Sequence, residues 1–255
     1  MKRAIRWALN HIPRSWLQRM AGWVVPIMGL AYVGRGRHCP ICGTRRRKFL
    51  PYGYVTSRED ALCPGCLSLE RHRAIWLYIT QRSDLLERHP RLLHIAPEVS
   101  LRNKLRRSYT GENYITADLE SPLADMHFDV QHIPLDDRSF DVVICNHLFE
   151  HVADDRRAMR ELYRIMRQGG WGIMTVPEDR SRATTFEDDT ITDPKERTAL
   201  FGQYDHRRIY GCDYDDRLRE AGFRVERIAC GDMLSLEERK LYAVGNDDIV
   251  VVYKD

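Results

Sequence analysis

Four of the seven cysteines form two pairs whose spacing suits a metal ion. Two residues separate Cys39 from Cys42, the same spacing recurs between Cys63 and Cys66, and twenty residues lie between the pairs. Two thiolates at this spacing on a tight turn bind one ion, the neighbouring Pro and Gly residues supply the turn, and the second pair completes a tetrahedral shell. We predict that all four cysteines bind one structural zinc ion. Iron in a rubredoxin-like centre and two disulfides are the alternatives.

The other three cysteines, Cys145, Cys212 and Cys230, have no ligand spacing, and we expect them to be small core residues. A zinc site needs reduced thiols, which favours a cytoplasmic protein. A peripheral position at a membrane is the alternative, because the chain begins with a basic and partly apolar segment.

Two aspartates stand where a nucleotide-type cofactor would be held. Asp118 ends an apolar run and lies 22 residues after Ala96, the end of the preceding run. At this position an acid can hold a ribose diol through two hydrogen bonds. Asp129 ends a third run, and we expect it and the segment from Val130 to border an adenine ring. The alternative for both aspartates is an N-cap or turn residue, the commonest role of Asp in loops.

These residues need a sheet that brings strand ends together. From residue 91 onward, short apolar runs alternate with helical stretches, which is typical of an α/β fold with a parallel sheet and crossover helices. We predict strands over residues 92–96, 113–117, 127–130, 140–146, 171–176, 223–229 and 249–253.

Two helices are predicted with more detail. A helix over 154–167 places Ala158, Leu162, Ile165 and Met166 on one face. Gly169 and Gly170 then stop it. A second helix, from about Ser68 to Arg82, docks the cysteine-rich segment onto the sheet, and we expect a solvated first turn at His72 and its neighbouring arginines.

Longer stretches resemble a known family. The run from Asp129, D-V-Q-H-I-P-L-D-D-R-S-F-D-V-V-I-C-N-H-L-F-E-H-V-A-D, and the later run R-E-L-Y-R-I-M-R-Q-G-G-W-G-I-M-T-V-P resemble class I S-adenosylmethionine-dependent methyltransferases of the type 11 group. The resemblance covers roughly residues 92–177. Outside it, C-P-x-C, S-L-E-R-H-R and the segment Phe201–Gly211 are similar to a bacterial subgroup that has an N-terminal four-cysteine zinc ribbon. Members of this subgroup often accompany polysaccharide or secondary-metabolite genes.

The resemblance implies a Rossmann-like class I methyltransferase sheet with helices on both faces, preceded by a small helical arm and the zinc ribbon. It also implies that S-adenosyl-L-methionine binds at the loops after the strands. We assign cofactor contacts to Ala96, Pro97, Glu98, Asp118, Leu119, Asp129, Val130, Asn146 and His147.

The first loop departs from the family, in which it is normally rich in glycine. Ala96 and Glu98 take the places of the first two glycines, with Pro97 between them. The Cβ of Ala96 fits there only if the φ angle is negative. Either Glu98 hydrogen-bonds the cofactor, or this pocket has lost it. The presence of Asp118, Asp129 and the E-H-V loop together favours retained binding.

Methyl transfer is an in-line displacement, so the protein chiefly supplies alignment. A base is still needed if the acceptor is a hydroxyl or a protonated amine. We predict His151, after the fourth strand, and His206, in the segment that covers the acceptor, as the catalytic residues, because a free imidazole accepts a proton near neutral pH. The alternative is a structural hydrogen bond for His151 and a role in lid architecture for His206.

The front of the chain differs in charge from the rest. Residues 1–58 contain twelve Lys and Arg residues and no Asp or Glu, whereas the remainder carries 28 basic and 37 acidic residues. Such asymmetry indicates an anionic partner for the front: nucleic acid, a membrane surface or the acidic body itself. The apolar residues Ile5, Leu9, Ile12, Trp16, Met20 and Trp23 recur at helical spacing and form a stripe that packs on the body or lies on a membrane through residues 1–34.

We therefore divide the chain into a basic amphipathic arm (1–36), a zinc ribbon with its docking helix (37–83) and a class I methyltransferase domain (84–255) with an acceptor lid near 184–211. The expected function is methylation of an oxygen or nitrogen atom of a small-molecule or saccharide acceptor. An RNA methyltransferase that uses the basic zinc module and a non-catalytic scaffold with a degenerate cofactor loop are the alternatives, nucleic acid being the less favoured partner. The sequence specifies no oligomeric state.

Overall fold

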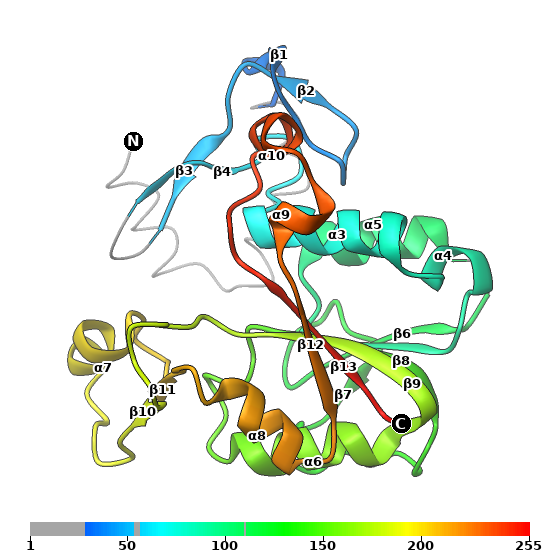
Figure 1. The fold of residues 1–255 in the computed structure, drawn as a ribbon, viewed down its shortest axis with the longest axis vertical. Coiled ribbons are helices and arrows are strands. Elements are labelled where there is room, and N and C mark those ends of the chain that lie inside the picture. Colours follow the sequence, from blue (N-terminus) through cyan, green and yellow to red (C-terminus); the bar gives the residue numbers. More distant parts are fainter. Residues whose placement is uncertain (1–28, 54–56, 110) are drawn as a thin grey trace.

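The computed structural model describes residues 29–53, 57–109 and 111–255. Its centre is a seven-stranded sheet (Figure 1), which confirms the α/β fold class. The strands lie in the order β7 (Met126–His127), β6 (Tyr114–Asp118), β5 (Leu92–Ile95), β8 (Phe140–Asn146), β9 (Met166–Thr175), β13 (Ile249–Tyr253) and β12 (Arg224–Ile228). The sheet is mixed rather than wholly parallel, because β13 runs antiparallel to both of its neighbours.

Each predicted strand has a counterpart, but β7 covers only Met126–His127 where 127–130 was predicted, and β9 begins five residues earlier than predicted. The helix before it, α6 (Asp155–Ile165), ends at Ile165, where Met166 takes an extended conformation. Gly169 and Gly170 lie inside β9, so the prediction that they stop the helix is wrong. Gly169 has a φ of +75° and lies where the pairing of β9 with β8 shifts register, which is where a strand needs a residue without a Cβ.

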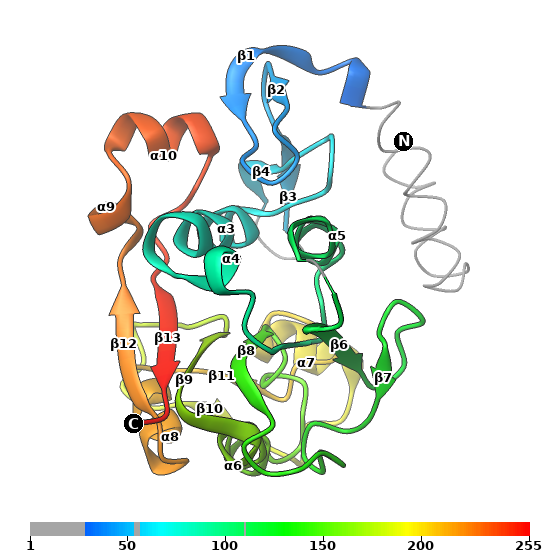
Figure 2. The ribbon, with the colours of Figure 1, turned by 90° about the vertical axis from the view of Figure 1, so that its right-hand side faces the viewer.

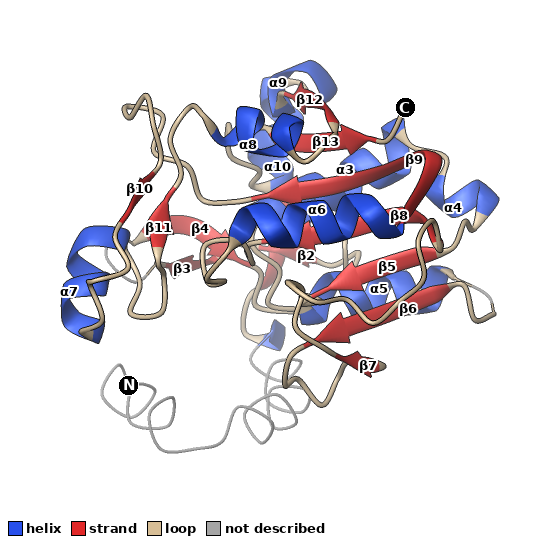
Figure 3. Cartoon of the chain, turned by 90° about the horizontal axis from the view of Figure 1, so that it is seen from below, coloured by secondary structure: helices blue, strands red, loops and turns tan. Residues whose placement is uncertain are grey.

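Helices cover both faces of the sheet (Figures 1 and 3), as predicted. One face carries α6 and α8 (Tyr214–Glu220), and the other carries α3 (Glu70–Arg82), α4 (Leu85–Arg88) and α5 (Val99–Ser108). Because successive strand residues point to opposite faces, Val142 and Ile144 of β8 join the core on the α3 side, whereas Val143 and Cys145 join the core on the α6 side.

The cysteine-rich segment forms two small hairpins beyond helix α3 (Figure 2). These pair β1 (Val33–His38) with β2 (Arg45–Arg46), and β3 (Leu50–Tyr52) with β4 (Arg58–Leu62). Two further helices, α9 (Cys230–Met233) and α10 (Leu236–Tyr242), lie on the same side of the sheet, and α10 contacts β1. We call residues 33–68 the ribbon.

One buried cation joins the ribbon to the rest of the molecule. The guanidinium of Arg73, on α3, donates to the carbonyl oxygens of Ala61 and Ser68 in the ribbon and of Tyr242 and Ala243 at the end of α10, over 2.6–3.0 Å. Helix α3 begins at Glu70, two residues later than predicted. Arg73 and its neighbour His72 are buried, so the prediction of a solvated first turn is wrong.

The predicted lid forms the elements β10 (Phe186–Glu187), α7 (Pro194–Phe201) and β11 (Arg208–Ile209), with β10 paired antiparallel to β11. These elements lie at the end of the sheet toward which strands β5, β6 and β9 point (Figure 3). The lid therefore stands at the carboxyl edge of the parallel strands, where ligands of α/β sheets bind.

Two further predictions have clear outcomes. Cys145 and Cys230 are buried as expected, but Cys212 is exposed, because it lies in the short loop between β11 and α8. The amphipathic stripe and residues 1–28 lie outside the described residues. Within the part of the chain that the structure describes, no helix is long and apolar enough to cross a membrane.

Candidate active site and metal centre

The four predicted metal ligands, Cys39, Cys42, Cys63 and Cys66, come together in the ribbon, with their sulfur atoms within 4.8 Å of one another. The Sγ atoms of Cys39 and Cys66 are 3.6 Å apart, and those of Cys42 and Cys63 are 3.9 Å apart. Four sulfurs at about 2.3 Å from a zinc ion in a tetrahedron are about 3.8 Å apart. The cluster therefore has the size that a tetrahedral thiolate site requires.

Each cysteine pair sits on the same kind of turn. The backbone N–H of Gly43 donates to the Cys39 carbonyl at 2.8 Å, and that of Leu67 donates to the Cys63 carbonyl at 2.9 Å. Gly43 and Leu67 occupy equivalent positions with φ angles of +69° and +57°. A glycine adopts this left-handed conformation readily, whereas Leu67 adopts it at a cost of roughly 1 kcal/mol.

The surroundings of the sulfurs suit four thiolates around one cation. The hydroxyl of Thr44 lies 3.0 Å from the Cys42 sulfur, and that of Ser68 lies within 3.3 Å of two other sulfurs. Contact with Cys39 lowers the pKa of the Cys42 thiol, whereas the same contact raises the pKa of Cys63 well above its usual range. Without a cation these thiols oppose one another's ionisation, and a divalent ion would remove that conflict.

Three predicted cofactor residues meet at the carboxyl edge of the sheet. Ala96 follows β5, Asp118 ends β6 and Asn146 ends β8, and these strands are neighbours. The register places Ile95 beside Ala117 on one side and beside Cys145 on the other, so the three residues lie level. This is the place in an α/β sheet where a nucleotide-type cofactor lies across the strands.

Ala96 does not have the backbone conformation predicted for it. Its φ angle is +46°, which is left-handed, so the prediction of a negative φ is wrong. The backbone N–H of Ala96 donates to the carbonyl oxygen of Ala117 at 2.8 Å, and this bond holds the turn that leads from β5 into α5. Ala96 thus adopts a backbone conformation that normally favours glycine.

Both aspartates have one or more oxygens bound to nearby backbone. Asp118 Oδ1 accepts the N–H groups of Glu120 and Ser121 at 2.9 and 2.8 Å. Asp129, two residues beyond the end of β7, accepts from the backbone and side-chain amides of Gln131. These bonds are those of turn-forming aspartates, and they also fix the direction of the carboxylates. Leu119 is 63% exposed and Val130 is buried.

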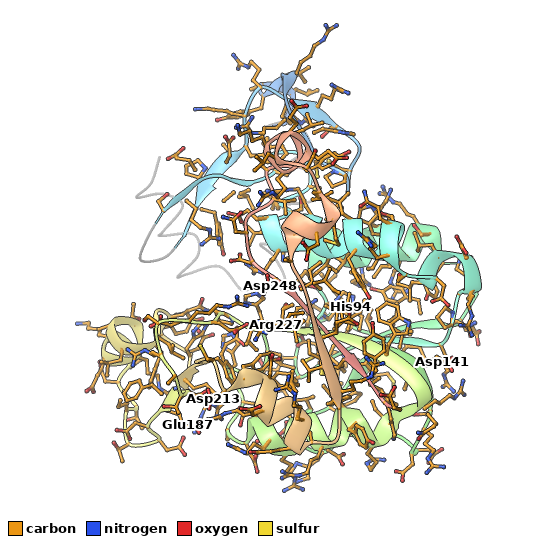
Figure 4. All side chains as sticks on the ribbon, in the orientation of Figure 1. His94, Asp141, Glu187, Asp213, Arg227 and Asp248 are labelled. Atoms are coloured by element: carbon orange, nitrogen blue, oxygen red, sulfur yellow. The ribbon has the colours of Figure 1, made fainter. Side chains whose placement is uncertain are left out.

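Glu98 stands at the end of a buried polar chain. The Tyr114 hydroxyl lies 3.0 Å from His94 Nδ1, and His94 Nε2 donates to Glu98 Oε2 at 2.9 Å, since an ionised carboxylate only accepts. His94 lies at the centre of the molecule, where the sheet meets helices α3 and α5 (Figure 4). Burial alone would raise the pKa of Glu98, but the hydrogen bond from His94 and the nearby histidine His72 lower it to about 2.

Helix α3 approaches this carboxylate through the side chain of His72. Its Nδ1 accepts the backbone N–H of Leu69 at 3.2 Å, so the proton of the neutral ring sits on Nε2, 3.8 Å from Glu98 Oε1. Burial lowers the pKa of His72 to about 3, which keeps the ring neutral. His72 Nε2 and Glu98 Oε1 are both buried without a hydrogen-bond partner among the described residues.

The loop after β8 carries a second buried carboxylate. Glu150 is 1% exposed, and its Oε1 lies 3.4 Å from His147 Nδ1. Burial would raise the pKa of Glu150, but contact with His147 lowers it overall. The other oxygen, Oε2, and the side-chain nitrogen Nδ2 of Asn146 are buried and have no hydrogen-bond partner within the described part of the chain.

The two predicted catalytic histidines lie against each other, although 54 positions separate them in the sequence. The ring centroids of His151 and His206 are 4.8 Å apart and the rings are nearly perpendicular. His206 Nδ1 lies 3.0 Å from the Phe201 carbonyl oxygen, and His151 Nδ1 lies 3.4 Å from an oxygen of Asp205. Burial lowers the pKa of His206, so it is neutral near pH 7.

A buried arginine fastens the lid to the loop after β8. Arg208, 3% exposed, donates to the carbonyl oxygens of Phe149, Val152 and Ala153 over 2.6–2.8 Å. It also pairs with Glu187 of β10 at 2.8 Å, and Glu187 lies at the base of the lid segment (Figure 4). The lid and the loop therefore form one unit.

Known proteins resemble the part of the chain that holds these loops. Residues 83–174, from the end of α3 into β9, match a family model described as a methyltransferase domain. Residues 83–174 therefore carry a methyltransferase domain. Over 100 residues it is 27% identical to a protein of Mycolicibacterium smegmatis described as a probable S-adenosylmethionine-dependent methyltransferase. That match covers 39% of this chain and 35% of the relative, so the chain spans about a third of the length of this curated relative.

Two solved structures are also similar to this chain. A SAM-dependent methyltransferase from Archaeoglobus fulgidus is 14% identical with a TM-score of 0.48, and the match covers 72% of this chain and 94% of that one. The YcgJ protein of Bacillus subtilis is 15% identical with a TM-score of 0.47, over 72% and 99% of the two chains.

Sequence reasoning missed the buried charged residues that join these elements to one another. Arg73 and Arg208 are buried cations bound to carbonyl oxygens, and Glu150 is a buried acid beside the catalytic candidates. Charged residues are normally exposed, so nothing in their local pattern marks them as buried. For Glu150, the E-H-V motif was a usable signal, because it placed an acid directly before a predicted catalytic histidine.

Proposed function

We propose that this protein is an S-adenosylmethionine-dependent methyltransferase that methylates an oxygen or nitrogen atom of a small-molecule or saccharide acceptor. The observation that carries the proposal is the loop after β5, where the ionised Glu98, whose side chain is 13% exposed, has one buried oxygen without a partner among the described residues. When bound, the cofactor supplies the methyl group and its own leaving group, so the protein chiefly aligns the two reactants.

The cofactor's amino-acid end would lie at Glu98, in the loop after β5. Glu98 Oε1 would accept hydrogen bonds from the ammonium group, and a carboxylate held ionised by His94 suits that role. Burial lowers the pKa of His147, and the charge of Arg71, at the start of α3, lowers it further. We assign Arg71 to the cofactor's carboxylate, since a guanidinium matches a carboxylate in charge and geometry.

The nucleoside end fits the neighbouring strand ends. Asp118 has one oxygen bound by its own turn, which leaves Oδ2 for the ribose hydroxyls. Asp129 and the buried Val130 would flank the adenine, with Leu119 covering its outer side. The backbone at Ala96 and Pro97 and the free Nδ2 of Asn146 complete the assignment.

The acceptor would lie between the cofactor and the lid, where His151 and His206 face it. The Phe201 carbonyl only accepts, so the proton of neutral His206 is on Nδ1 and its Nε2 is bare. That nitrogen can take a proton from a hydroxyl or ammonium acceptor. We propose His206 and His151 as the catalytic residues on this ground.

Calorimetry with S-adenosylhomocysteine tests the cofactor site. The wild-type protein should bind it, and Asp118→Ala and Glu98→Gln should each weaken binding at least tenfold, because each loses a charge-assisted hydrogen bond worth about 1.5–3 kcal/mol. Asp136→Ala, at an exposed loop residue, is the matched control and should bind normally. No heat and no thermal stabilisation at millimolar ligand would refute the enzyme and favour the scaffold alternative.

RNA methylation is the second candidate, and the surface of the ribbon favours it. Arg35, Arg45, Arg47 and Lys48 are all exposed on the ribbon. Such a patch binds a phosphate backbone with an affinity that falls steeply as salt is added. RNA binding with that salt dependence, lost when Arg45 and Lys48 are changed to Glu, would promote this candidate over a small-molecule acceptor.

A further inference from the structure

Three side chains, two in the loop after β8 and one in the segment between α7 and β11, form a set of metal-binding donors. Glu150, His151 and His206 each offer one ligand atom, and these atoms lie within 4.8 Å of one another. Two imidazoles and one carboxylate are the donors of catalytic zinc sites and of non-haem iron sites, which keep positions open for a substrate. We propose that Glu150, His151 and His206 bind a divalent transition-metal ion at a second site, separate from the four cysteines.

Both imidazoles are oriented as metal ligands usually are. His206 Nδ1 donates to the carbonyl oxygen of Phe201 at 3.0 Å, which leaves Nε2 bare. His151 Nδ1 lies 3.4 Å from a carboxylate oxygen of Asp205, so a carboxylate faces one nitrogen of this ring as well. A ligating histidine commonly gives its second ring nitrogen to a carbonyl or carboxylate, because that contact fixes the tautomer and the ring direction.

The carboxylate of Glu150 is an independent sign of a missing partner. It is 1% exposed, and its Oε1 is engaged by His147 at 3.4 Å. Its Oε2 is buried and accepts no hydrogen bond from any described residue. A buried carboxylate oxygen left unpaired is costly, and a cation between it and two imidazoles would satisfy it.

The backbone that carries the three ligands is held together. The N–H of Arg207 donates to the carbonyl oxygen of Glu150 at 2.8 Å, so the residue after His206 is bonded to the residue before His151. Ligands at about 2.0–2.2 Å from a zinc ion lie about 3.4 Å apart in a tetrahedron. Side-chain shifts of little more than about 1 Å would therefore close these donors around an ion.

We expect the ion to bind an oxygen atom of the methyl acceptor. This role rests on the proposed function. A divalent ion lowers the pKa of a hydroxyl that it binds, so the acceptor hydroxyl would release its proton to solvent water near neutral pH. Its oxygen would then take the methyl group from the cofactor's sulfonium, which leaves as a neutral thioether. In the ion-bound protein the histidines act through the metal, and in the metal-free protein His206 is the base. A hydroxyl acceptor with a second oxygen nearby, such as a sugar or a diphenol, suits the open positions.

Binding of Mn²⁺ to the zinc-loaded full-length protein tests this site, because Mn²⁺ prefers nitrogen and oxygen ligands to thiolates. Electron paramagnetic resonance should show one Mn²⁺ bound per chain. His206→Gln and Glu150→Gln should each weaken binding at least tenfold, whereas His127→Gln, at an exposed residue of β7, should not. Because Glu150 is buried, thermal unfolding checks that the Glu150→Gln protein is folded. His206 is partly exposed, so His206→Gln should fold normally and provides a second test of the site.

Two results would overturn the second metal site: no Mn²⁺, Co²⁺ or Zn²⁺ bound beyond the four-cysteine site at millimolar concentration, or equal Mn²⁺ binding by the His206→Gln and His127→Gln variants. S-adenosylhomocysteine binding, measured in the same samples, separates this inference from the proposed function. Cofactor binding without the ion refutes the metal site and leaves the methyltransferase standing. Binding of the ion without the cofactor supports the metal site and refutes the methyltransferase.

Discussion

The backbone N–H of Ala96 donates to the carbonyl oxygen of Ala117 across 2.8 Å, and this bond ties the first residue after β5 to the neighbouring strand β6. Ala96 holds a φ of +46° to make it. A residue with a Cβ pays roughly 1–2 kcal/mol for that conformation, which a glycine adopts freely. The loop after β5 therefore stores a strain that glycine would remove.

Ala96→Gly should raise the free energy of unfolding by about 1 kcal/mol, because it removes the strain while keeping the hydrogen bond. Urea denaturation of the two proteins measures the difference. Ala117→Gly is the matched control. Ala117 is buried in a regular strand, so removal of its methyl group should lower the free energy of unfolding. An equal loss of stability in both variants would show that the turn at Ala96 carries no strain.

Arg208→Lys should destabilise the protein by about 3 kcal/mol, since a lysine cannot reach the carbonyl oxygens of Phe149, Val152 and Ala153 together and would be left buried and poorly paired. Arg207→Lys is the control, because that side chain is 28% exposed and its pair with Asp189 lies at the surface. It should change stability by less than about 0.5 kcal/mol. Thermal unfolding measures the stability of each variant. Similar losses of stability in the two variants would show that Arg208 does not hold the lid to the loop after β8.

The central strands were predictable because they are buried on both sides, so their residues read as short apolar runs. All four residues of β5 are buried, and β8 has six buried residues of seven. The cysteine spacing likewise predicted the ribbon, because ligand geometry restricts where thiols can stand.

The lid was predicted only as a segment, because polar contacts rather than an apolar pattern hold it. Strand β10 is fixed by Glu187, which pairs with the buried Arg208 and Arg217, and Arg217 also pairs with Asp155 of α6. Each of these residues is charged and looks like surface in the sequence. A pairing between charges from distant parts of the chain leaves no periodic trace, so the place of β10 and β11 emerges only in three dimensions.

Removal of the metal should unfold the ribbon, since the four-cysteine cluster joins β1–β4 to the core around α3. Metal analysis of the purified protein should find zinc rather than iron at the four cysteines. Cys42→Ser should lower the zinc content and the melting temperature, and Cys212→Ser, at an exposed cysteine, should change neither. A chelator that leaves the melting temperature of the wild-type protein unchanged would contradict a structural role for the metal.

Acid should destabilise the protein through His72, and the sign follows from its lowered pKa. Burial brings the pKa of His72 from an ordinary value of 6.5 to about 3 in the folded protein. Between these values the unfolded chain binds a proton that the folded protein does not, so the free energy of unfolding falls as the pH falls through this window. The loss from this residue is about 2–3 kcal/mol between pH 7.5 and pH 4.5.

His72→Gln removes that dependence while keeping an acceptor for the Leu69 N–H, which now donates to His72 Nδ1. Urea denaturation at pH 7.5, 6 and 4.5 should therefore show a shallower acid loss in the variant than in the wild-type protein. Both proteins contain the same four cysteines, so an effect of metal loss on stability at low pH is the same in each and cancels in the comparison. Parallel pH profiles would mean that His72 takes up its proton in the folded state. The ring of His72 on α3 would then face the ionised Glu98 as an imidazolium rather than as a neutral imidazole.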